Sequence, residues 1–246
     1  MANKPKPQTA SSRRDTIEAM RRQQRAKERR KTILFVSIAV VLGLALIAAV
    51  AIPTYLDSRN DPLKKDLAAL GVPAAQAGCN PVQEDPPTAG ADHKPEGEKV
   101  EYPTIPPSSG PHAQNFEVAP RAFYTKDDTP SVERLVHSLE HGHTILWYDS
   151  TVTGDQLDMV KDIAARARTE EASRNKFIAA PLDESRGPLP EGKHIALSHW
   201  GDSEPRGENK TAWKAYRQIC AAPSGDVVAQ FVKAHPASDA PEAGAA

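Results

Sequence analysis

The chain has 246 residues, with 31 Lys and Arg against 32 Asp and Glu, two Cys, 22 Pro and 14 Gly. The near-neutral total combines a basic N-terminal segment with an acidic remainder. Residues 1–31 hold eleven basic and three acidic side chains, and residues 32–52 hold no charge. Residues 53–246, the body of the chain, hold 20 basic and 29 acidic side chains. This pattern excludes a simple soluble cytosolic domain. It also argues against nucleic acid as a partner of the body, because a phosphate backbone requires a concentration of Lys and Arg.

An uncharged apolar run occupies residues 33–52. As a helix rising about 1.5 Å per residue it covers roughly 30 Å, the hydrocarbon thickness of a bilayer. We predict a single transmembrane helix over residues 32–53 in the cell membrane, with residues 1–31 as a basic cytoplasmic tail and the rest outside, because Lys and Arg beside such a helix stay on the cytoplasmic side. The alternatives are a buried core helix and a cleaved signal peptide, with Ala49-Val50-Ala51 as its cleavage site.

The composition after this run predicts three further parts. Residues 54–78 form a juxtamembrane helix, at 61–70, and a linker. Residues 79–235 form an extracytoplasmic domain. Its first part, up to about residue 120, is a loop rich in Pro, called the Pro-rich segment below. Such a long loop without regular structure is either functional or tied down. Residues 236–246, rich in Ala, Pro and acid, are predicted to be disordered.

Strand and helix patterns alternate from about residue 120 onward. We predict strands at 99–102, 122–125, 144–148, 176–180 and 194–200, and helices at 129–141, after a Thr153/Gln156 capping box, after Asn209 (with Trp213, Tyr216 and Cys220 on one face) and after Asp226. This alternation predicts an α/β or α+β fold with one small mixed sheet packed with helices.

Cys79 and Cys220 are the two cysteines. An even count outside the membrane favours a disulfide, which would tie the start of the domain to the predicted helix near its end. A reactive thiol or a metal-binding pair is the alternative.

Five of the eight histidines lie within residues 93–143: His93, His112, His137, His141 and His143. On a helical wheel, Leu135 and Leu139 mark the apolar face, whereas His137, Glu140 and His141 share an arc of roughly 100° turned away from it. Two histidines four residues apart are spaced to share a metal ion. The alternative is a polar helix face with two exposed histidines.

The predicted ligand set for a divalent transition metal, Zn or Cu, is His112 from the Pro-rich loop, His137 and His141 from the helix, Glu140 as an orienting residue or further ligand, and His143 as a fourth imidazole. The stretch from His137 to His141 also matches H-x-x-E-H, the inverted zinc-peptidase motif, in which Glu140 would be the general base. A helix that stops at Gly142 fits that motif poorly, so catalysis is the less favoured reading.

Several sequence blocks occur together: Gly78-Cys79, Tyr-Pro-Thr-Ile-Pro-Pro-Ser-Ser-Gly-Pro-His over 102–112, Leu-Val-His-Ser-Leu-Glu-His-Gly over 135–142, and Ala-Leu-Ser-His-Trp-Gly over 196–201. In these blocks the chain resembles the actinobacterial family of membrane-anchored proteins known as domain of unknown function 3105, roughly over residues 70–242. His199 departs from the family pattern, which has a small residue before the Trp. The resemblance implies a single-pass anchor with an outer domain and supplies no activity.

The sequence therefore favours a membrane-anchored extracytoplasmic domain that binds Zn or Cu through a histidine cluster. A metal-free module of the cell envelope that binds another envelope protein is the second hypothesis. A metal-dependent hydrolase is the third.

Overall fold

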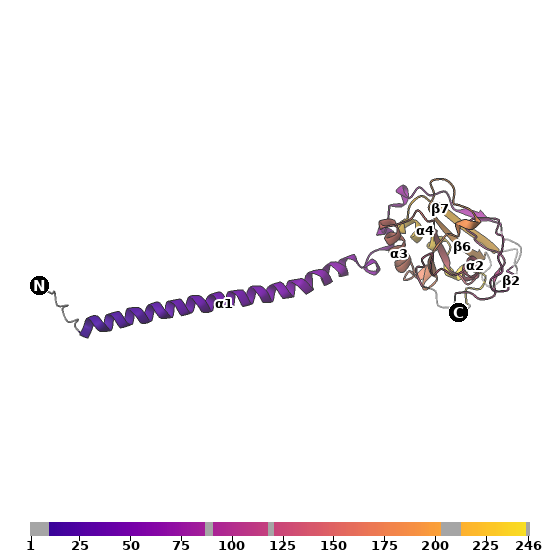
Figure 1. Cartoon of the computed structure of the whole chain (residues 1–246). Coiled ribbons are helices and arrows are strands. Elements are labelled where there is room, and N and C mark those ends of the chain that lie inside the picture. The colour runs from indigo at the N-terminus through magenta and orange to yellow at the C-terminus, as the bar shows by residue number, and fades with distance from the viewer. Residues whose placement is uncertain (1–9, 87–90, 118–120, 203–212, 245–246) are drawn as a thin grey trace. The chain divides into compact units, whose positions relative to one another are not determined.

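The computed structural model describes residues 10–86, 91–117, 121–202 and 213–244. The chain divides into two compact units, residues 1–60 and residues 61–246 (Figure 1). The first unit is the helix α1 (Ala10–Asn60) and the second is an α+β domain.

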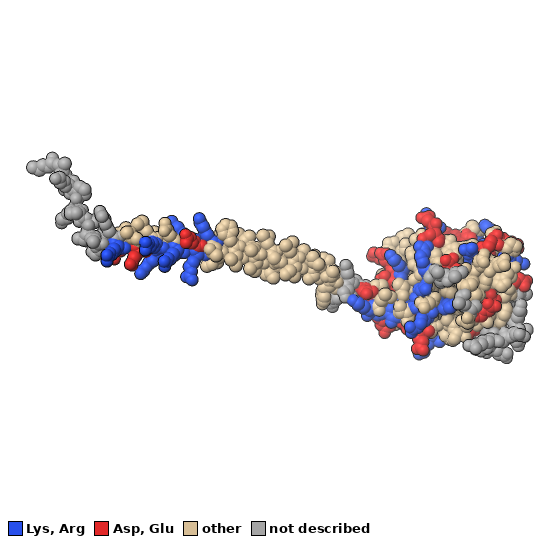
Figure 2. Space-filling model, turned by 90° about the horizontal axis from the view of Figure 1, so that it is seen from below, with Lys and Arg blue, Asp and Glu red and all other residues tan. Residues whose placement is uncertain are grey.

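Helix α1 joins a basic stretch to an apolar one without a break. Figure 2 shows Lys and Arg gathered on the N-terminal part of this helix, followed by a stretch without charged side chains. Within the described residues, Arg14–Leu56 is the one helical segment long and apolar enough to cross a membrane, with a mean hydropathy of 3.0 in its most apolar window. None of that window is buried in the protein, so this helix could anchor the chain in a bilayer.

The second unit is built on a five-stranded mixed sheet in the order β1-β7-β6-β4-β5. Its strands are β1 (Gln83–Asp85), β4 (Thr144–Tyr148), β5 (Phe177–Pro181), β6 (Ile195–Asp202) and β7 (Trp213–Cys220). The β4 and β5 strands are parallel and are connected through the helix α3 (Asp155–Ala167), whereas the other pairs are antiparallel. The sheet therefore confirms the predicted fold class.

Both faces of the sheet are covered by helices. Along β4, Leu146 packs with α3 and with the helix α4 (Gly225–Ala234), while Ile145 and Trp147 pack with the helix α2 (Val132–Glu140) on the opposite face. This alternation follows from the two-residue period of side chains along a strand. The predicted histidine helix, α2, thus lies on the face away from α3 and α4.

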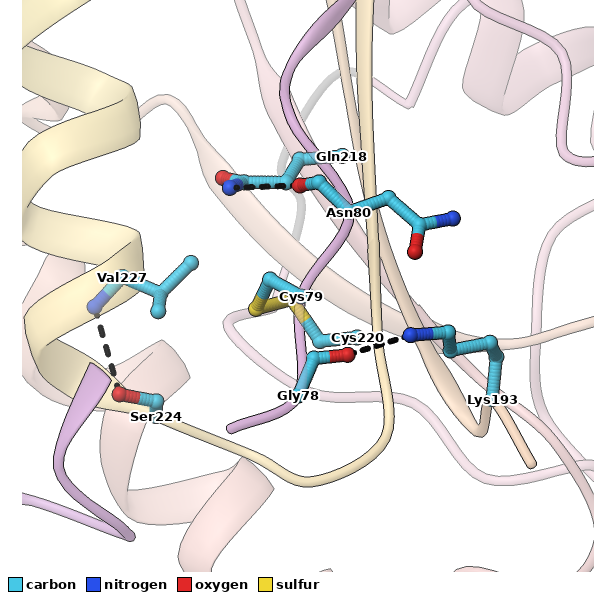
Figure 3. The surroundings of a disulfide bond; sticks show 8 residues. All are labelled: Gly78, Cys79, Asn80, Lys193, Gln218, Cys220, Ser224 and Val227. Atoms are coloured by element: carbon cyan, nitrogen blue, oxygen red, sulfur yellow. Dashed lines mark hydrogen bonds between the residues drawn. A yellow bond between two sulfur atoms is a disulfide. The ribbon is translucent and has the colours of Figure 1, made fainter. Parts of the chain in front are cut away.

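The disulfide Cys79–Cys220 joins the segment before β1 to the end of β7 (Figure 3). Two hydrogen bonds run beside it: Gln218 Nε2 donates to the carbonyl of Asn80 (3.3 Å), and the amide of Asn80 donates to the carbonyl of Ile219 (2.9 Å). The even cysteine count therefore predicted the bond, although its second partner lies in a strand.

The prediction of a helix after Asn209 is wrong. Asn209 lies outside the described residues, and Trp213, Tyr216 and Cys220 belong to strand β7, whose side chains alternate between buried and partly buried positions. The antiparallel pairing of β7 with β6 along its whole length, and with β1 at Ala215–Arg217, supplies backbone hydrogen bonds to the strand.

Four shorter predictions also need correction. Lys99–Tyr102 is not a strand, and residues 122–125 contribute one isolated bridge between Phe123 and Ala179. Helix α3 is capped by Gly154 with no side-chain hydrogen bond, so Thr153 and Gln156 form no capping box. The helix predicted to begin near residue 129 begins at Val132, because the Ser131 hydroxyl accepts the amide of Arg134.

The two ends of the domain are more ordered than their composition predicts. Residues 61–70 form two short 3-10 turns instead of one helix, and Leu67 and Leu70 enter the core below α4. The segment from Pro236, predicted to be disordered, makes a 3-10 turn at Ala237–Asp239 and buries Ala240 to 1% exposure.

His235, at the end of α4, stacks on Tyr216 with ring centroids 3.8 Å apart. Burial is the main cause that lowers its pKa to about 4, and the nearby His199 acts in the same direction. The carboxylates of Asp239 and Glu84 oppose this shift. His235 is therefore neutral in the folded protein at pH 7.

Candidate metal centre

A short parallel ribbon brings two histidines together. The strands β2 (His93–Lys94) and β3 (His112–Ala113) pair in a register that sets His93 opposite His112, with ring centroids 4.9 Å apart. The amide of His112 donates to the carbonyl of Asp92 (3.1 Å). The pairing joins two residues that are 19 positions apart in the Pro-rich segment.

Helix α2 supplies the other side of the cluster. His137, Glu140 and His141 are buried, with 4%, 2% and 5% exposure, although they face away from the apolar side of the helix. His112 from β3 lies against His137 with ring centroids 4.4 Å apart, and Phe116 lies 4.3 Å from His141. The Pro-rich segment therefore covers this polar face, which excludes the reading of two exposed histidines.

A buried ion pair holds the Pro-rich segment against the sheet. Asp85 of β1 and Arg217 of β7 pair through two guanidinium nitrogens, and the Ser108 hydroxyl donates to Asp85 (2.7 Å). Arg217 also donates to the carbonyl of Ile105 (3.4 Å). Asp85 and Arg217 are at most 9% exposed. Because so little solvent reaches these two charges, their main partners are each other and the Pro-rich segment, which they hold in place.

A second clamp fixes the same segment to α2. Glu133 accepts the amide of Val100 (3.0 Å) and pairs with Arg186 (2.6 Å), whose guanidinium also donates to the carbonyl of Val100 (2.7 Å). The Tyr102 hydroxyl donates to the carbonyl of Pro111, next to His112. The loop is thus tied down on both sides of the cluster, as its length required.

Backbone carbonyls fix the tautomers of two histidines. His112 Nδ1 lies 2.8 Å from the carbonyl of Gly110, and His137 Nδ1 lies 2.8 Å from the carbonyl of Ala113. A carbonyl only accepts, so each Nδ1 carries a proton and each ring turns its Nε2 inward. This arrangement is usual for metal-binding histidines.

The inward-facing atoms lie close together, and His137 Nε2 has one hydrogen-bond partner, His141 Nε2 at 3.1 Å. His112 Nε2 lies 3.1 Å from Glu140 Oε2, and His137 Nε2 lies 3.9 Å from the same oxygen. Both His112 Nε2 and Glu140 Oε2 are buried and make no hydrogen bond. Burial, reinforced by His112, lowers the pKa of His137 to about 4, so its ring is neutral at pH 7. A bound cation would satisfy these facing acceptors.

The ligand atoms lie within a small movement of the distances that one divalent metal requires. Bonds of about 2.0–2.2 Å in a tetrahedral site place neighbouring ligand atoms about 3.3–3.6 Å apart. One ligand atom from each of His93, His112, His137 and Glu140 lies within 4.8 Å of the others. Three of these side chains are buried and His93 is exposed, so the set opens to solvent at His93.

A second set adjoins the first through a shared carboxylate. Ligand atoms of Glu140, His141 and Glu242 lie within 4.8 Å of one another, and His141 Nε2 is 3.3 Å from Glu242 Oε2. His141 Nε2 also lies 3.1 Å from His137 Nε2. His141 is therefore a neighbour of the first set without belonging to it.

His143 is the predicted ligand that the structure does not bring to the cluster. Its Nδ1 lies 3.0 Å from the carbonyl of Ser138, and it is absent from both sets. Burial lowers its pKa to about 3.

Sequence reasoning missed His93 and Glu242. His93 was visible as part of the five-histidine group, whereas no sequence signal marked Glu242 in an acidic, Ala-rich tail.

The C-terminal segment passes directly over the end of α2. The amide of Glu242 donates to the carbonyl of Glu140 (3.0 Å), and Asp239 Oδ1 lies 2.8 Å from His199 Nε2. Gly142 has φ +90°, and a Cβ there would lie 2.5 Å from the carbonyl oxygen of Ala237. Glycine at this position lets the C-terminal segment pack closely against the end of α2, which places Glu242 beside the cluster.

The fold and site define a class: an α+β domain with a largely buried His–Glu cluster, preceded by a long apolar helix that could anchor it. The chain belongs to the family described as "Protein of unknown function (DUF3105)", whose sequence model matches residues 93–246. This range begins at His93 and contains every residue of both sets. No curated protein and no solved structure matches the chain.

Proposed function

We propose that this protein is a single-pass membrane protein whose extracytoplasmic domain binds one divalent transition metal, Zn²⁺ or Cu²⁺, through His93, His112, His137 and Glu140. The observation that carries the proposal is the pair of contacts between Nδ1 and a backbone carbonyl, which turn the Nε2 atoms of His112 and His137 toward a buried carboxylate oxygen that accepts no hydrogen bond. Imidazole nitrogen suits both metals, and carboxylate oxygen completes a four-ligand set.

Binding or delivery of the metal fits this site better than hydrolysis. In the inverted peptidase motif the glutamate acts on a metal-bound water, whereas here Glu140 Oε2 lies among the ligand atoms, 3.1 Å from His112 Nε2. Four protein ligands around one ion resemble a closed structural site more than a catalytic site with an open position.

The metal test uses the full-length chain, without a His-tag, purified in mild detergent and incubated with Zn²⁺ or Cu²⁺. After desalting, elemental mass spectrometry measures bound metal in the parent, in the double variant His112→Gln/His137→Gln, and in the control His194→Gln. The control removes a histidine that pairs with Asp149 on the part-exposed edge of the fold. We expect metal in the parent and control and at least a tenfold loss in the double variant.

Unchanged metal in a folded double variant would overturn the proposal, as would a folded parent that takes up neither metal. In the latter case the cluster would be structural, holding the loop to α2, and a metal-free module with an envelope protein partner would become the better hypothesis. Circular dichroism on each variant separates loss of a ligand from loss of the fold.

The proposed topology has its own test. The nine bases between Arg13 and Lys31 precede the apolar stretch, and the disulfide suits an oxidising compartment. Protease added to intact cells should remove residues 61–246 and leave the basic end protected. Protection of the whole chain would refute this orientation.

A further inference from the structure

We infer that the cluster holds two adjacent metal positions, with Glu140 as the carboxylate between them and with Glu242 and His141 as the remaining ligands of the second. This inference extends the proposed function, in which the first position is formed by His93, His112, His137 and Glu140. The second position would keep room for water or an anionic ligand.

The spacing of the ligand atoms argues for two positions. Ligands of one ion with bonds of about 2.0–2.2 Å cannot lie more than about 4.4 Å apart. The six side chains do not fall within one set even at 4.8 Å; they fall into two sets that share Glu140. A single ion therefore cannot reach all six side chains as they stand.

Glu140 is suited to join two ions. It belongs to both sets, and it is 2% exposed. Its Oε2 has no hydrogen-bond partner, and a carboxylate has two oxygens that can bind different cations. Bridging carboxylates of this kind are found where two metals lie about 3.5–4 Å apart.

His141 is placed for the second position. Its Nε2 is directed to Glu242 Oε2 (3.3 Å) and to His137 Nε2 (3.1 Å), while its buried Nδ1 makes no hydrogen bond. The ring of Phe116 covers one side of the imidazole. The buried ring is thus held with one nitrogen directed at the junction between the two sets.

The two positions differ in the number of their protein ligands. Each has one exposed ligand, His93 at the first position and Glu242 at the second, and the other ligands of both are buried. Three protein ligands at the second position leave a tetrahedral ion one site for water or an anion. The ion at the second position would therefore be the more exchangeable one.

Equilibrium titration tests the stoichiometry. The full-length protein in detergent is titrated with Zn²⁺ against a chromophoric chelator, and the parent is compared with Glu242→Gln and with the control Glu191→Gln, an exposed glutamate on a loop. We expect two equivalents for the parent and control and one for Glu242→Gln, whose affinity for the remaining ion stays within about threefold of the parent's tighter site.

Adjacency is tested by loading the same three proteins with Cu²⁺ and recording electron paramagnetic resonance spectra. Two neighbouring Cu²⁺ ions should give a coupled spectrum with a half-field line in the parent and control, and Glu242→Gln should give the spectrum of an isolated Cu²⁺.

The outcomes separate the two proposals. One equivalent in the parent, lost in His112→Gln/His137→Gln, would overturn the second position and leave the proposed function intact. Two equivalents without magnetic coupling, or two equivalents retained by Glu242→Gln, would also overturn it. No binding by folded parent protein would overturn the proposed function itself.

Discussion

Replacing Gly142 with alanine should detach the C-terminal segment from the end of α2. The residue has φ +90°, a conformation that costs an alanine about 1–2 kcal/mol. The new methyl group would also lie 2.5 Å from the carbonyl oxygen of Ala237. A backbone atom cannot rotate away as a side chain can, so the segment itself must move.

The cost of that movement can be estimated from what the segment contributes. It would lose the amide hydrogen bond from Glu242 to Glu140 and the contact between Asp239 and His199, each worth about 1 kcal/mol, and the burial of Ala240, worth about 1 kcal/mol. Together with the backbone strain, we expect Gly142→Ala to lower the free energy of unfolding by about 4–5 kcal/mol.

Gly192→Ala is the matched control. Gly192 has φ +71°, yet nothing lies within 4 Å of a Cβ built there, so this variant should show the backbone strain of about 1–2 kcal/mol alone. Urea titration gives both values, and limited proteolysis reports whether the C-terminal segment has become accessible. Equal losses in the two variants, with the segment still protected, would refute the reasoning.

Three further changes test the Asp85–Arg217 ion pair, the disulfide and the half-buried His235. Arg217→Leu leaves Asp85 buried without its partner, and we expect urea titration to show a loss of about 3–5 kcal/mol, with a change below 1 kcal/mol contradicting a role for the pair. Reducing the disulfide removes a cross-link between residues 141 positions apart and should lower stability by up to about 5 kcal/mol; identical urea midpoints for reduced and oxidised protein would contradict this. His235 has a pKa lowered from 6.5 to about 4, so its contribution to stability is present above pH 6.5 and is lost as the pH falls toward 4, because the unfolded chain binds the proton first. Replacing it in His235→Phe should therefore flatten the fall in stability over this range by up to about 1.4 kcal/mol per pH unit, and an unchanged slope would count against it.

The fold could be predicted wherever one local period dominated. Helix α3 carries a single apolar stripe, and β4 is a run of branched and aromatic residues, so both were predicted within a few residues. Strand β7 was not, because Trp213, Tyr216 and Cys220 also fit a helical stripe. The burial of Ala215 and Arg217 in alternation follows from neighbours on β6 and β1, which local sequence does not contain.

The same difference between local patterns and long-range contacts decides which site residues could be predicted. His137, Glu140 and His141 could be placed on one side of a helix because helical geometry is fixed by spacing alone. His93 arrives through a two-residue strand pairing, and Glu242 arrives through a tail that packs only because Gly142 admits it. Both depend on contacts between residues that are far apart in the chain, so no local pattern pointed to them.

The spread of the cluster along the chain has a consequence for the order of events. Its side chains come from positions 93 to 242, so the cluster cannot be assembled until nearly the whole domain has been synthesised and its most distant contacts have formed. In small zinc-binding domains the ion drives folding of a chain that is otherwise unfolded. Here the carbonyls of Gly110 and Ala113 orient the imidazoles of His112 and His137, so the ligand geometry depends on the folded backbone, and metal capture would report that the domain has folded.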